Sequence, residues 1–358
     1  MLISSPSKYY CLAWNRVYVK SNGRIPCWCD AGEPHTILMA DLNTQDFVTQ
    51  IVNSPQMREM RLKILEQQQH YNSYCDKCCF FQEIGRGRNF RHQDHIPETP
   101  HSLFKKVSTA TQTMQRVAKN RGWEYGSIAN ISEIQLEPSF ACNLRCPGCL
   151  HGWHPEPLKS EEKPYIFPYE WFTSMIDSMV MHSVNLRKFT FVGRGEPTLN
   201  KQFPDMIAQA RQRMPNTIMS MDTNATQEFK DEYLLLDWIN CSIDGSTEEA
   251  YNTYRYGGDF FKAIRFMRKA VYQKAIHQST CKIIWKYILF NTTEDIELLN
   301  TAQNMARSLG IDELHFVITA VGSHDGTVTP AKTMNNFDVI TDYIKTNPIF
   351  HNVLVTLS

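Results

Sequence analysis

From residue 131 onward, short apolar stretches alternate with segments whose apolar residues recur at helical spacing. The predicted strands are 131–137, 187–192, 217–222, 238–243, 281–290 and 313–319. The predicted helices are 168–182, 203–213, 227–235, 259–275 and 294–309. Strands separated by helices in this way build parallel sheets through right-handed crossovers. Six such units predict an α/β fold with an open, partial (βα)6 TIM-like barrel rather than a closed eight-stranded one.

The first part of the chain has a different pattern. The segment RVYVKSNGRIPCWCD alternates apolar and polar residues around Asn22-Gly23, which predicts a β-hairpin. Residues 44–69 carry apolar residues at helical spacing, and Ser54-Pro55 divides them into two helices. A further helix is predicted over 101–120. The expected domains are a cysteine-rich α+β domain, a linker with a helix, the barrel and a C-terminal extension, over 1–95, 96–130, 131–320 and 321–358.

Charge and hydropathy exclude several classes of protein. The 358 residues include 37 Lys and Arg and 37 Asp and Glu, a balance that gives no support for a nucleic-acid or anionic-membrane partner. The first ten residues lack the charged and apolar regions of a signal peptide. No apolar run reaches the length of about 18 residues that a membrane-spanning helix needs. We therefore expect a cytoplasmic protein that binds neither nucleic acid nor membrane.

The eleven cysteines of the sequence need a chemical explanation. Their odd number, their clustering and the lack of an export signal argue against disulfides and favour metal binding. Cys241 and Cys281 stand alone inside predicted strands, where we expect them to be small buried apolar residues. The other nine fall in groups along the chain: Cys11, Cys27, Cys29, Cys75, Cys78, Cys79, Cys142, Cys146 and Cys149.

The sequence CNLRCPGC places Cys142, Cys146 and Cys149 on a loop directly after the first predicted barrel strand. Three thiolates at this spacing can hold three irons of a cubane cluster and leave the fourth iron open to a ligand. A complete four-cysteine ferredoxin site is excluded locally, because no fourth cysteine lies near residue 149. A zinc site made from any four of the thiols is the alternative. Barrel enzymes place their chemistry on loops of this kind, at the carboxyl ends of strands.

This loop resembles the signature of the radical S-adenosylmethionine (SAM) superfamily, and later segments match the family in order. The similar segments are FVGRGEPTLN (191–200), MDTNA (221–225), CSIDG (241–245), YNTYRYGGDF (251–260) and WKYILFNTTEDIE (285–297). The resemblance covers about 131–320. It implies that a 4Fe-4S cluster reduces SAM, and that the resulting 5′-deoxyadenosyl radical abstracts hydrogen from a substrate. Catalytic acid and base residues are not assigned.

The resemblance also implies contacts to SAM. Gly193 and Gly195 allow close backbone approach, and Glu196 would accept a hydrogen bond from the SAM ammonium, with a tight turn and a solvated carboxylate as the alternative. The remaining expected contacts are Thr223 and Asn224 to the ribose, Ser242, Arg255 to the carboxylate, and the backbone near Val317 and Ile318 to adenine. An Asx turn is the alternative for Asn224, and a surface salt bridge for Arg255. Gly148 departs from the family, which often has an aromatic residue there, and the weaker pocket candidates are Glu137, Asp244, His151 and His154.

The N-terminal cysteines resemble a twitch domain, the half-length form of the SPASM auxiliary-cluster domain. Cys11, either Cys27 or Cys29, Cys75 and Cys78 would supply four thiolates to a second 4Fe-4S cluster. A zinc knuckle is the alternative. Further alternative ligands are Cys79, His35, His70, His92 and His95. In the relatives this domain follows the barrel, whereas here it precedes it.

The expected function is that of a radical SAM enzyme acting on a peptide or small metabolite, assisted by the auxiliary cluster. The lack of a peptide-recognition domain of the winged-helix type weakens the peptide version, and a sugar or nucleotide-linked substrate is the alternative. The expected electron donor is a small partner such as flavodoxin or ferredoxin. A non-catalytic zinc-binding scaffold is the competing class of function.

Overall fold

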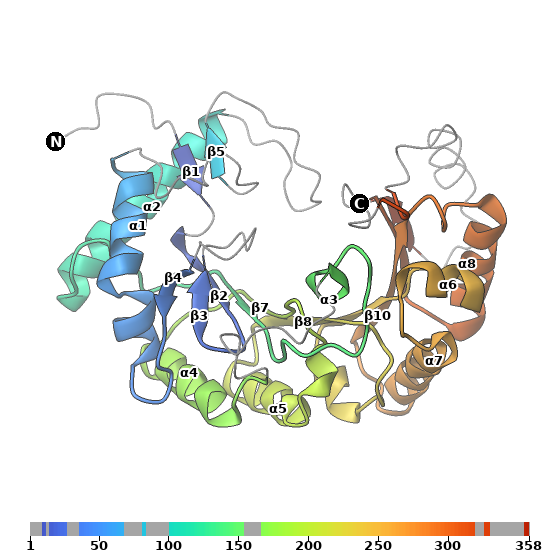
Figure 1. Ribbon diagram of the computed structural model, residues 1–358. Coiled ribbons are helices and arrows are strands. Elements are labelled where there is room, and N and C mark those ends of the chain that lie inside the picture. The colour runs from blue at the N-terminus through green and yellow to red at the C-terminus, as the bar shows by residue number, and fades with distance from the viewer. Residues whose placement is uncertain are drawn as a thin grey trace. The chain divides into compact units, whose positions relative to one another are not determined.

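The computed structural model describes residues 9–11, 14–26, 36–67, 81–83, 100–153, 166–318, 326–329 and 354–357. The chain divides into two compact units, each shown as part of the ribbon in Figure 1. Unit 1 comprises 1–136, 167–189 and 213–217, and unit 2 comprises 137–166, 190–212 and 218–358. Among the described residues, no helix is both long and apolar enough to cross a membrane.

Unit 2 is built on an open parallel sheet with the strand order β12-β11-β10-β9-β8-β7. Its strands are β7 (Lys188–Phe191, which begins in unit 1), β8 (Ile218–Thr223), β9 (Trp238–Ser242), β10 (Lys282–Leu289), β11 (Glu313–Ile318) and β12 (Leu354–Leu357). With β6 (Glu133–Leu136) in unit 1, all six predicted strands are present. The partial-barrel fold class is thereby confirmed. The unpredicted strand β12 pairs in parallel with β11.

Helices connect these strands, and α5 (Phe203–Arg213), α7 (Phe260–Ile276) and α8 (Ile296–Leu309) cover one side of them (Figure 1). The short helix α3 (Leu150–Trp153) lies on the other side, and α6 (Glu248–Tyr254) follows β9. The helix predicted over 227–235 is wrong in type and extent, because only a 3-10 helix, η7 (Asp231–Leu235), forms there. The rings of Phe229, Tyr233 and Phe266 contact one another in the core. The backbone hydrogen bonds of the segment span three residues, as where the Leu236 N–H donates to the Tyr233 oxygen at 3.2 Å.

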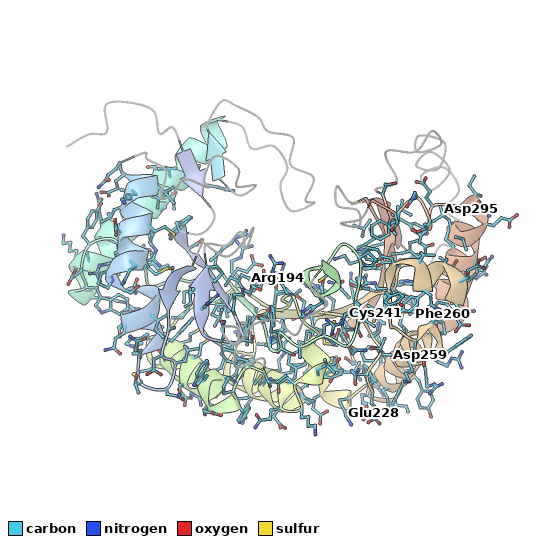
Figure 2. The ribbon with its side chains drawn as sticks, viewed as in Figure 1. Arg194, Glu228, Cys241, Asp259, Phe260 and Asp295 are labelled. Atoms are coloured by element: carbon cyan, nitrogen blue, oxygen red, sulfur yellow. The ribbon has the colours of Figure 1, made fainter. Side chains whose placement is uncertain are left out.

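The two faces of the unit 2 sheet differ in burial. On β9, Ile239 and Cys241 are fully buried, whereas Asn240 and Ser242 on the opposite face remain partly exposed. Cys241, labelled in Figure 2, and Cys281 are both buried, as predicted. Because side chains alternate between faces along a strand, one face packs in the apolar core and the other stays accessible and polar.

Unit 1 contains the N-terminal strands, and here the predicted hairpin is wrong. The turn itself forms: Gly23 has a φ of 79° and donates a backbone hydrogen bond to the Lys20 oxygen. However, β2 (Arg16–Val19) pairs in parallel with β6, and β3 (Arg24–Pro26) pairs antiparallel with β4 (Thr36–Met39). A third pair joins β1 (Tyr9–Cys11) to β5 (Phe81–Glu83).

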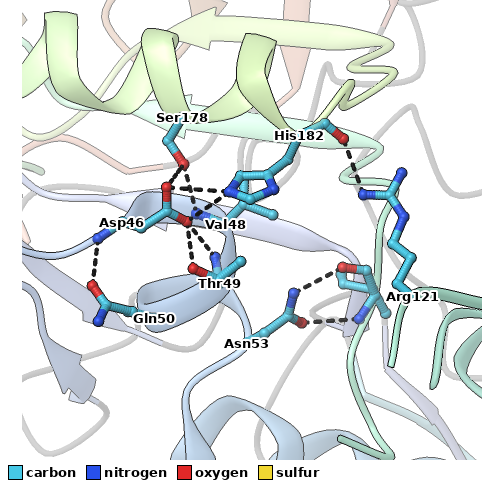
Figure 3. Close-up of polar contacts among 9 residues, drawn as sticks. Asp46, Val48, Thr49, Gln50, Asn53, Arg121, Ser178 and His182 are labelled. Carbon is cyan, nitrogen blue, oxygen red and sulfur yellow. Dashed lines mark hydrogen bonds and ion pairs between the residues drawn. The ribbon is translucent and has the colours of Figure 1, made fainter. Parts of the chain in front are cut away.

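The helices of unit 1 follow the prediction more closely. They are the π-helix η3 (Phe47–Val52), α1 (Pro55–Leu65), α2 (Pro100–Arg121) and α4 (Tyr169–Met181). The predicted break at Ser54-Pro55 is confirmed, and the Ser54 hydroxyl caps α1 by accepting from the Met57 N–H at 3.3 Å. Figure 3 shows how Asp46 caps η3 and accepts a hydrogen bond from Ser178 of α4 at 2.8 Å. The polar network therefore fastens η3 to α4.

Candidate functional site

The cysteine loop of unit 2 is compact and partly buried. Cys146 is 8% exposed, Cys142 and Cys149 are partly buried, and all three are free thiols. A turn closes where the Cys149 N–H donates to the Cys146 oxygen at 2.9 Å. The three cysteines pack against a small apolar cluster that consists of Leu144, Tyr254, Phe290, Val328 and Ile288. The loop thus shields one side of each thiol from water.

Nitrogen donors reach two of the three sulfurs. The Leu144 N–H lies 3.4 Å from Cys142 Sγ, and Asn224 Nδ2 lies 3.9 Å from the same atom. Arg255 Nη1 lies 3.9 Å from Cys146 Sγ. Burial raises the pKa of Cys142 to about 12, so an isolated thiol there would keep its proton. Donors aimed at sulfur and a coordinated metal both favour the thiolate instead.

Arg255 is held by a buried carboxylate. Its Nε lies 2.6 Å from Asp244 Oδ2, and the two side chains are 12% and 0% exposed. Asp244 Oδ1 accepts the Ile288 N–H at 2.7 Å, which ties the pair to β10. Burial alone would lower the pKa of Arg255, but Asp244 and Cys146 raise it, so the guanidinium stays charged. The surface salt bridge considered from the sequence is therefore a buried one, directed at the cysteine loop.

Glu196 is a buried carboxylate that joins the ends of β7 and β8. It is 2% exposed. Its Oε1 accepts from the Thr198 backbone and hydroxyl and from the Thr223 hydroxyl, the last at 2.6 Å, while Oε2 accepts from the Asn224 N–H at 2.7 Å. Burial raises its pKa even though these donors oppose the shift. Of the two oxygens, Oε2 carries fewer donors and has more capacity for a ligand.

The glycines of the 191–200 segment lie against protein. A Cβ on Gly193 would overlap the Glu137 side chain, and one on Gly195 would overlap the backbone of Ser139 and Phe140. Glu137 is fully buried, and its Oε1 accepts the N–H of Arg194, a residue labelled in Figure 2, at 2.7 Å. The absence of side chains at 193 and 195 is therefore already required by packing within the protein.

Asn224 forms the Asx turn that the sequence offered as an alternative. Its Oδ1 accepts the Thr226 N–H at 3.0 Å, and its Nδ2 donates to Asn143 Oδ1 at 3.1 Å. Thr223 Oγ1 accepts from the N–H of Ala225, whose φ is 60°. The turn directs the Asn224 amide nitrogen toward the cysteine loop, so its contact to a ribose remains a prediction.

The other predicted residues lie around this constellation. Ser242 ends β9 partly exposed, and Val317 lies opposite Ile288 on β11, one residue before the strand ends at Ile318. His151 is 5% exposed and packs on Phe140 with ring centroids 5.1 Å apart. Burial, with help from Arg145, lowers the His151 pKa and favours the neutral ring. His154 lies outside the described residues.

One buried acid was missed by the sequence reasoning. Glu294 follows β10 and is 2% exposed, and among the described residues neither of its carboxylate oxygens has a hydrogen-bond partner. Burial raises its pKa to about 7. No local pattern in NTTED distinguishes this carboxylate from an exposed loop acid.

The N-terminal cysteines can be followed only in part. Cys11 lies in β1 with its backbone opposite Phe81 of β5, and Phe81 comes three positions after Cys78 in the sequence. The strand pair thus connects the two ends of the cysteine-rich segment. Outside the described residues lie the other predicted ligands and alternatives: Cys27, Cys29, Cys75, Cys78, Cys79, His35, His70, His92 and His95.

The donor set of the cysteine loop is compatible with a cubane cluster. A cubane binds each cysteine to a different iron, and three cysteines leave its fourth iron without a protein ligand. Cys142, Cys146 and Cys149 are three free thiols on one loop, which is the donor set that such a cluster needs.

Comparisons with known proteins agree with this geometry. Residues 136–297 match the radical SAM superfamily, and residues 11–79 match the SPASM iron-sulfur cluster-binding domain. No curated protein sequence matches the chain.

Among solved structures, SuiB of Streptococcus suis bound to SAM is similar at 13% identity, over 96% of this chain and 71% of SuiB, with a TM-score of 0.46. A radical SAM methyltransferase from Sphaerobacter thermophilus is similar at 10% identity, over 62% and 64% of the two chains, with a TM-score of 0.42. The two domain matches imply 4Fe-4S clusters and SAM as cofactors. The chain therefore contains a segment, residues 136–297, that matches the radical SAM superfamily, and a SPASM match that precedes it at residues 11–79.

Proposed function

We propose that this enzyme binds its SAM-cleaving cluster through Cys142, Cys146 and Cys149 and abstracts hydrogen from a peptide or small metabolite. The observation that carries the proposal is the set of three free thiols on one loop, two of them facing N–H donors. When bound, the cluster supplies the electron that breaks a carbon–sulfur bond of SAM. The protein's own contribution is to bind, orient and shield.

The side chains around the cysteine loop have different roles in binding, orienting and shielding. Arg255, fixed by Asp244, keeps a planar cation beside Cys146, where its remaining N–H groups can donate to the SAM carboxylate. Glu196 orders Thr223 and Asn224 through its Oε1 and Oε2 and offers Oε2 to the SAM ammonium. Tyr254 and Phe290, whose ring centroids lie 4.1 Å apart, exclude water behind the cysteines.

The accessible face of the unit 2 sheet is where we place the substrate. There Asn240 donates to Asp222 at 2.7 Å, and Lys286 lies 3.3 Å from the same carboxylate. Side chains from three neighbouring strands thus form a polar, charged floor near the site. This floor suits a polar substrate, either a peptide or a small metabolite such as a sugar derivative.

The auxiliary cluster is assigned to the N-terminal cysteines. Cys11, one of Cys27 and Cys29, Cys75 and Cys78 would hold it, either to exchange electrons with the substrate or to anchor it. The SPASM match begins at residue 11 and ends at residue 79, which are both cysteines. A flavodoxin or ferredoxin would supply the electron for SAM cleavage.

Release of 5′-deoxyadenosine tests the proposal. Protein reconstituted anaerobically with iron and sulfide should contain about eight irons and release 5′-deoxyadenosine when given SAM and dithionite. Cys142→Ala should lose this release, whereas Cys281→Ala, which changes a buried cysteine outside the loop, should keep it. A zinc-loaded protein that cleaves no SAM would support the scaffold alternative instead.

A further inference from the structure

Helix α7 is unusually basic for a chain without net charge. Its sequence, FFKAIRFMRKAVYQKAI, contains five Lys and Arg and no carboxylate. Each of the three lysines forms an ion pair. Lys262 pairs with Asp259, the N-cap of the helix, Lys269 pairs with Glu228, and Lys274 pairs with Asp312. Figure 2 labels Asp259, at the start of the helix, and Glu228. Arg265 and Arg268 are exposed, and no ion pair with another described residue is found for either.

The two arginines lie within an exposed aromatic stripe. Phe261 is 58% exposed, Tyr272 65% and Ile276 54%. Positions 261, 265, 268, 272 and 276 recur at helical spacing and therefore share one face of α7. An exposed apolar surface with arginines among aromatic residues is characteristic of protein interfaces. The stripe thus has the composition of a docking surface for an acidic partner.

The turn that leads into α7 lies next to the cysteine loop. Tyr256, in this turn, is 66% exposed, and its carbonyl accepts the Arg145 N–H at 2.9 Å. The neighbouring Gly257 approaches the Asn143 oxygen, which lies 3.8 Å from where its Cβ would be. Asn143 and Arg145 are exposed members of the loop that contains Cys142 and Cys146. Exposed residues of the cysteine loop therefore contact the turn that begins four residues before Phe260 and leads into α7.

We propose that Tyr256, Phe261, Arg265 and Arg268 form the docking surface for an acidic protein that carries single electrons, such as a flavodoxin or ferredoxin. The proposal rests on the proposed function. One electron leaves the reduced carrier and enters the cluster, so the carrier ends one electron more oxidised and no bond is made or broken. Because electron tunnelling weakens steeply with distance, a carrier must dock close to the cysteines. The Tyr256 carbonyl accepts a hydrogen bond from the backbone N–H of Arg145, the residue that precedes Cys146.

Direct binding is the first test. The reconstituted full-length protein is titrated with an oxidised acidic flavodoxin and with a ferredoxin, and the Kd is measured by fluorescence anisotropy. The Arg265→Glu/Arg268→Glu variant should bind its carrier at least tenfold more weakly, and Phe261→Ser several-fold more weakly. Arg187→Glu, the same charge reversal at an exposed position of unit 1, should leave Kd unchanged. Wild-type affinity should fall with salt, because the attraction is electrostatic.

A comparison of electron donors is the second test. With dithionite, the variants should release 5′-deoxyadenosine at the wild-type rate. With subsaturating reduced flavodoxin or ferredoxin, Arg265→Glu/Arg268→Glu should be at least tenfold slower, and saturating carrier should restore the rate. Wild type that is inactive with dithionite would instead refute the proposed function, so the two failures are distinguishable.

Three results would overturn the docking proposal. The first is an Arg265→Glu/Arg268→Glu variant that binds both carriers as tightly as the wild-type protein does, or a wild-type protein that binds neither carrier. The second is an oligomer in wild type that the same variant dissociates, which would make the stripe a self-association face. The third is binding of a short RNA or DNA that the variant loses while carrier binding persists.

Discussion

Each unit places an arginine guanidinium below the surface, and the two are stabilised in different ways. In unit 1, Arg61 is 0% exposed, and the described oxygens to which it donates are all uncharged. Its Nε bonds the Trp14 carbonyl at 2.7 Å and its Nη2 bonds the Val52 carbonyl at 2.8 Å, while Nη1 reaches Asn53 and Gly126. Burial, together with the neighbouring Arg58, lowers the pKa of Arg61 to about 9.

In unit 2, Arg255 is paired with Asp244, and its pKa is raised instead. Arg61 donates four of its five N–H groups to oxygens of unit 1. Arg255 donates through Nε to Asp244 and directs Nη1 toward Cys146 Sγ. The difference teaches that burial alone does not mark a functional cation. The distinguishing feature is a counter-ion that holds the charge while donors remain available.

The largest expected effect comes from removing the counter-ion. Asp244→Ala leaves Arg255 as a buried charge without its partner and the Ile288 N–H without an acceptor, so the unfolding free energy should fall by about 3–5 kcal/mol. Chemical denaturation of the metal-free protein measures this loss. Asp259→Ala removes a more exposed carboxylate and should cost only about 1 kcal/mol. Equal losses in both variants would show that the Asp244–Arg255 pair is not buried as described.

Replacing Arg61 should lower the unfolding free energy somewhat less than Asp244→Ala does. Arg61→Met removes the donor to four oxygens, of which Asn53 Oδ1 still accepts the Ile128 N–H, and we expect a loss of about 3 kcal/mol in unfolding free energy. The same denaturation experiment measures it, with Lys63→Met on α1 as a partly exposed control worth about 0.5 kcal/mol. The folded fraction should still cleave SAM at the normal rate. Loss of SAM cleavage without loss of stability would remove the distinction between the two arginines.

A milder change at Arg255 should affect function more than stability. Arg255→Lys keeps the charge but loses the planar set of donors, so SAM cleavage should slow by about 10–100-fold. Loss of an N–H directed at Cys146 should also make the cluster's reduction potential more negative, since such bonds stabilise the reduced state. Potentiometric titration followed by EPR measures this shift. An unchanged potential and rate would mean that Arg255 has no functional contact with the loop.

The last expected effect is a pH-dependent change at Glu294, a buried acid whose carboxylate oxygens have no hydrogen-bond partner among the described residues. Between pH 4.5 and about 7, folded Glu294 keeps a proton that the unfolded chain has released, so its contribution to stability falls as pH rises through this window. Glu294→Gln does not titrate and should gain up to about 3 kcal/mol over wild type at pH 8 and little at pH 4. Thermal unfolding at the two pH values tests this. An equal difference at both would show that Glu294 does not titrate in this range.

The six strands could be predicted because apolar runs determine them locally. The spacing of Cys142, Cys146 and Cys149 predicts a metal-binding loop, and the structure shows that the three are free thiols on one loop. The pairing of β2 with β6 could not be predicted, because it joins segments more than one hundred residues apart. The Asn22-Gly23 turn forms without the predicted hairpin because the strands on either side of it pair with other strands.

Side-chain partners were harder to predict than side-chain identities. Arg255 was singled out, yet its counter-ion Asp244 lies at the end of another element, eleven positions earlier. Glu196 was expected near a ligand, whereas most of its acceptor capacity serves the turns after β7 and β8. Such contacts depend on how strand ends are juxtaposed, which hydrophobic periodicity does not encode.

EPR of the dithionite-reduced protein, recorded with and without SAM, tests the central claim most directly. Comparison of wild type with the Cys142→Ala/Cys146→Ala/Cys149→Ala variant separates the loop cluster from any cluster at the N-terminal cysteines. We predict a wild-type signal that changes when SAM is added, and a variant whose remaining signal does not respond to SAM. A wild-type signal indifferent to SAM, or a variant that responds as wild type does, would contradict the account.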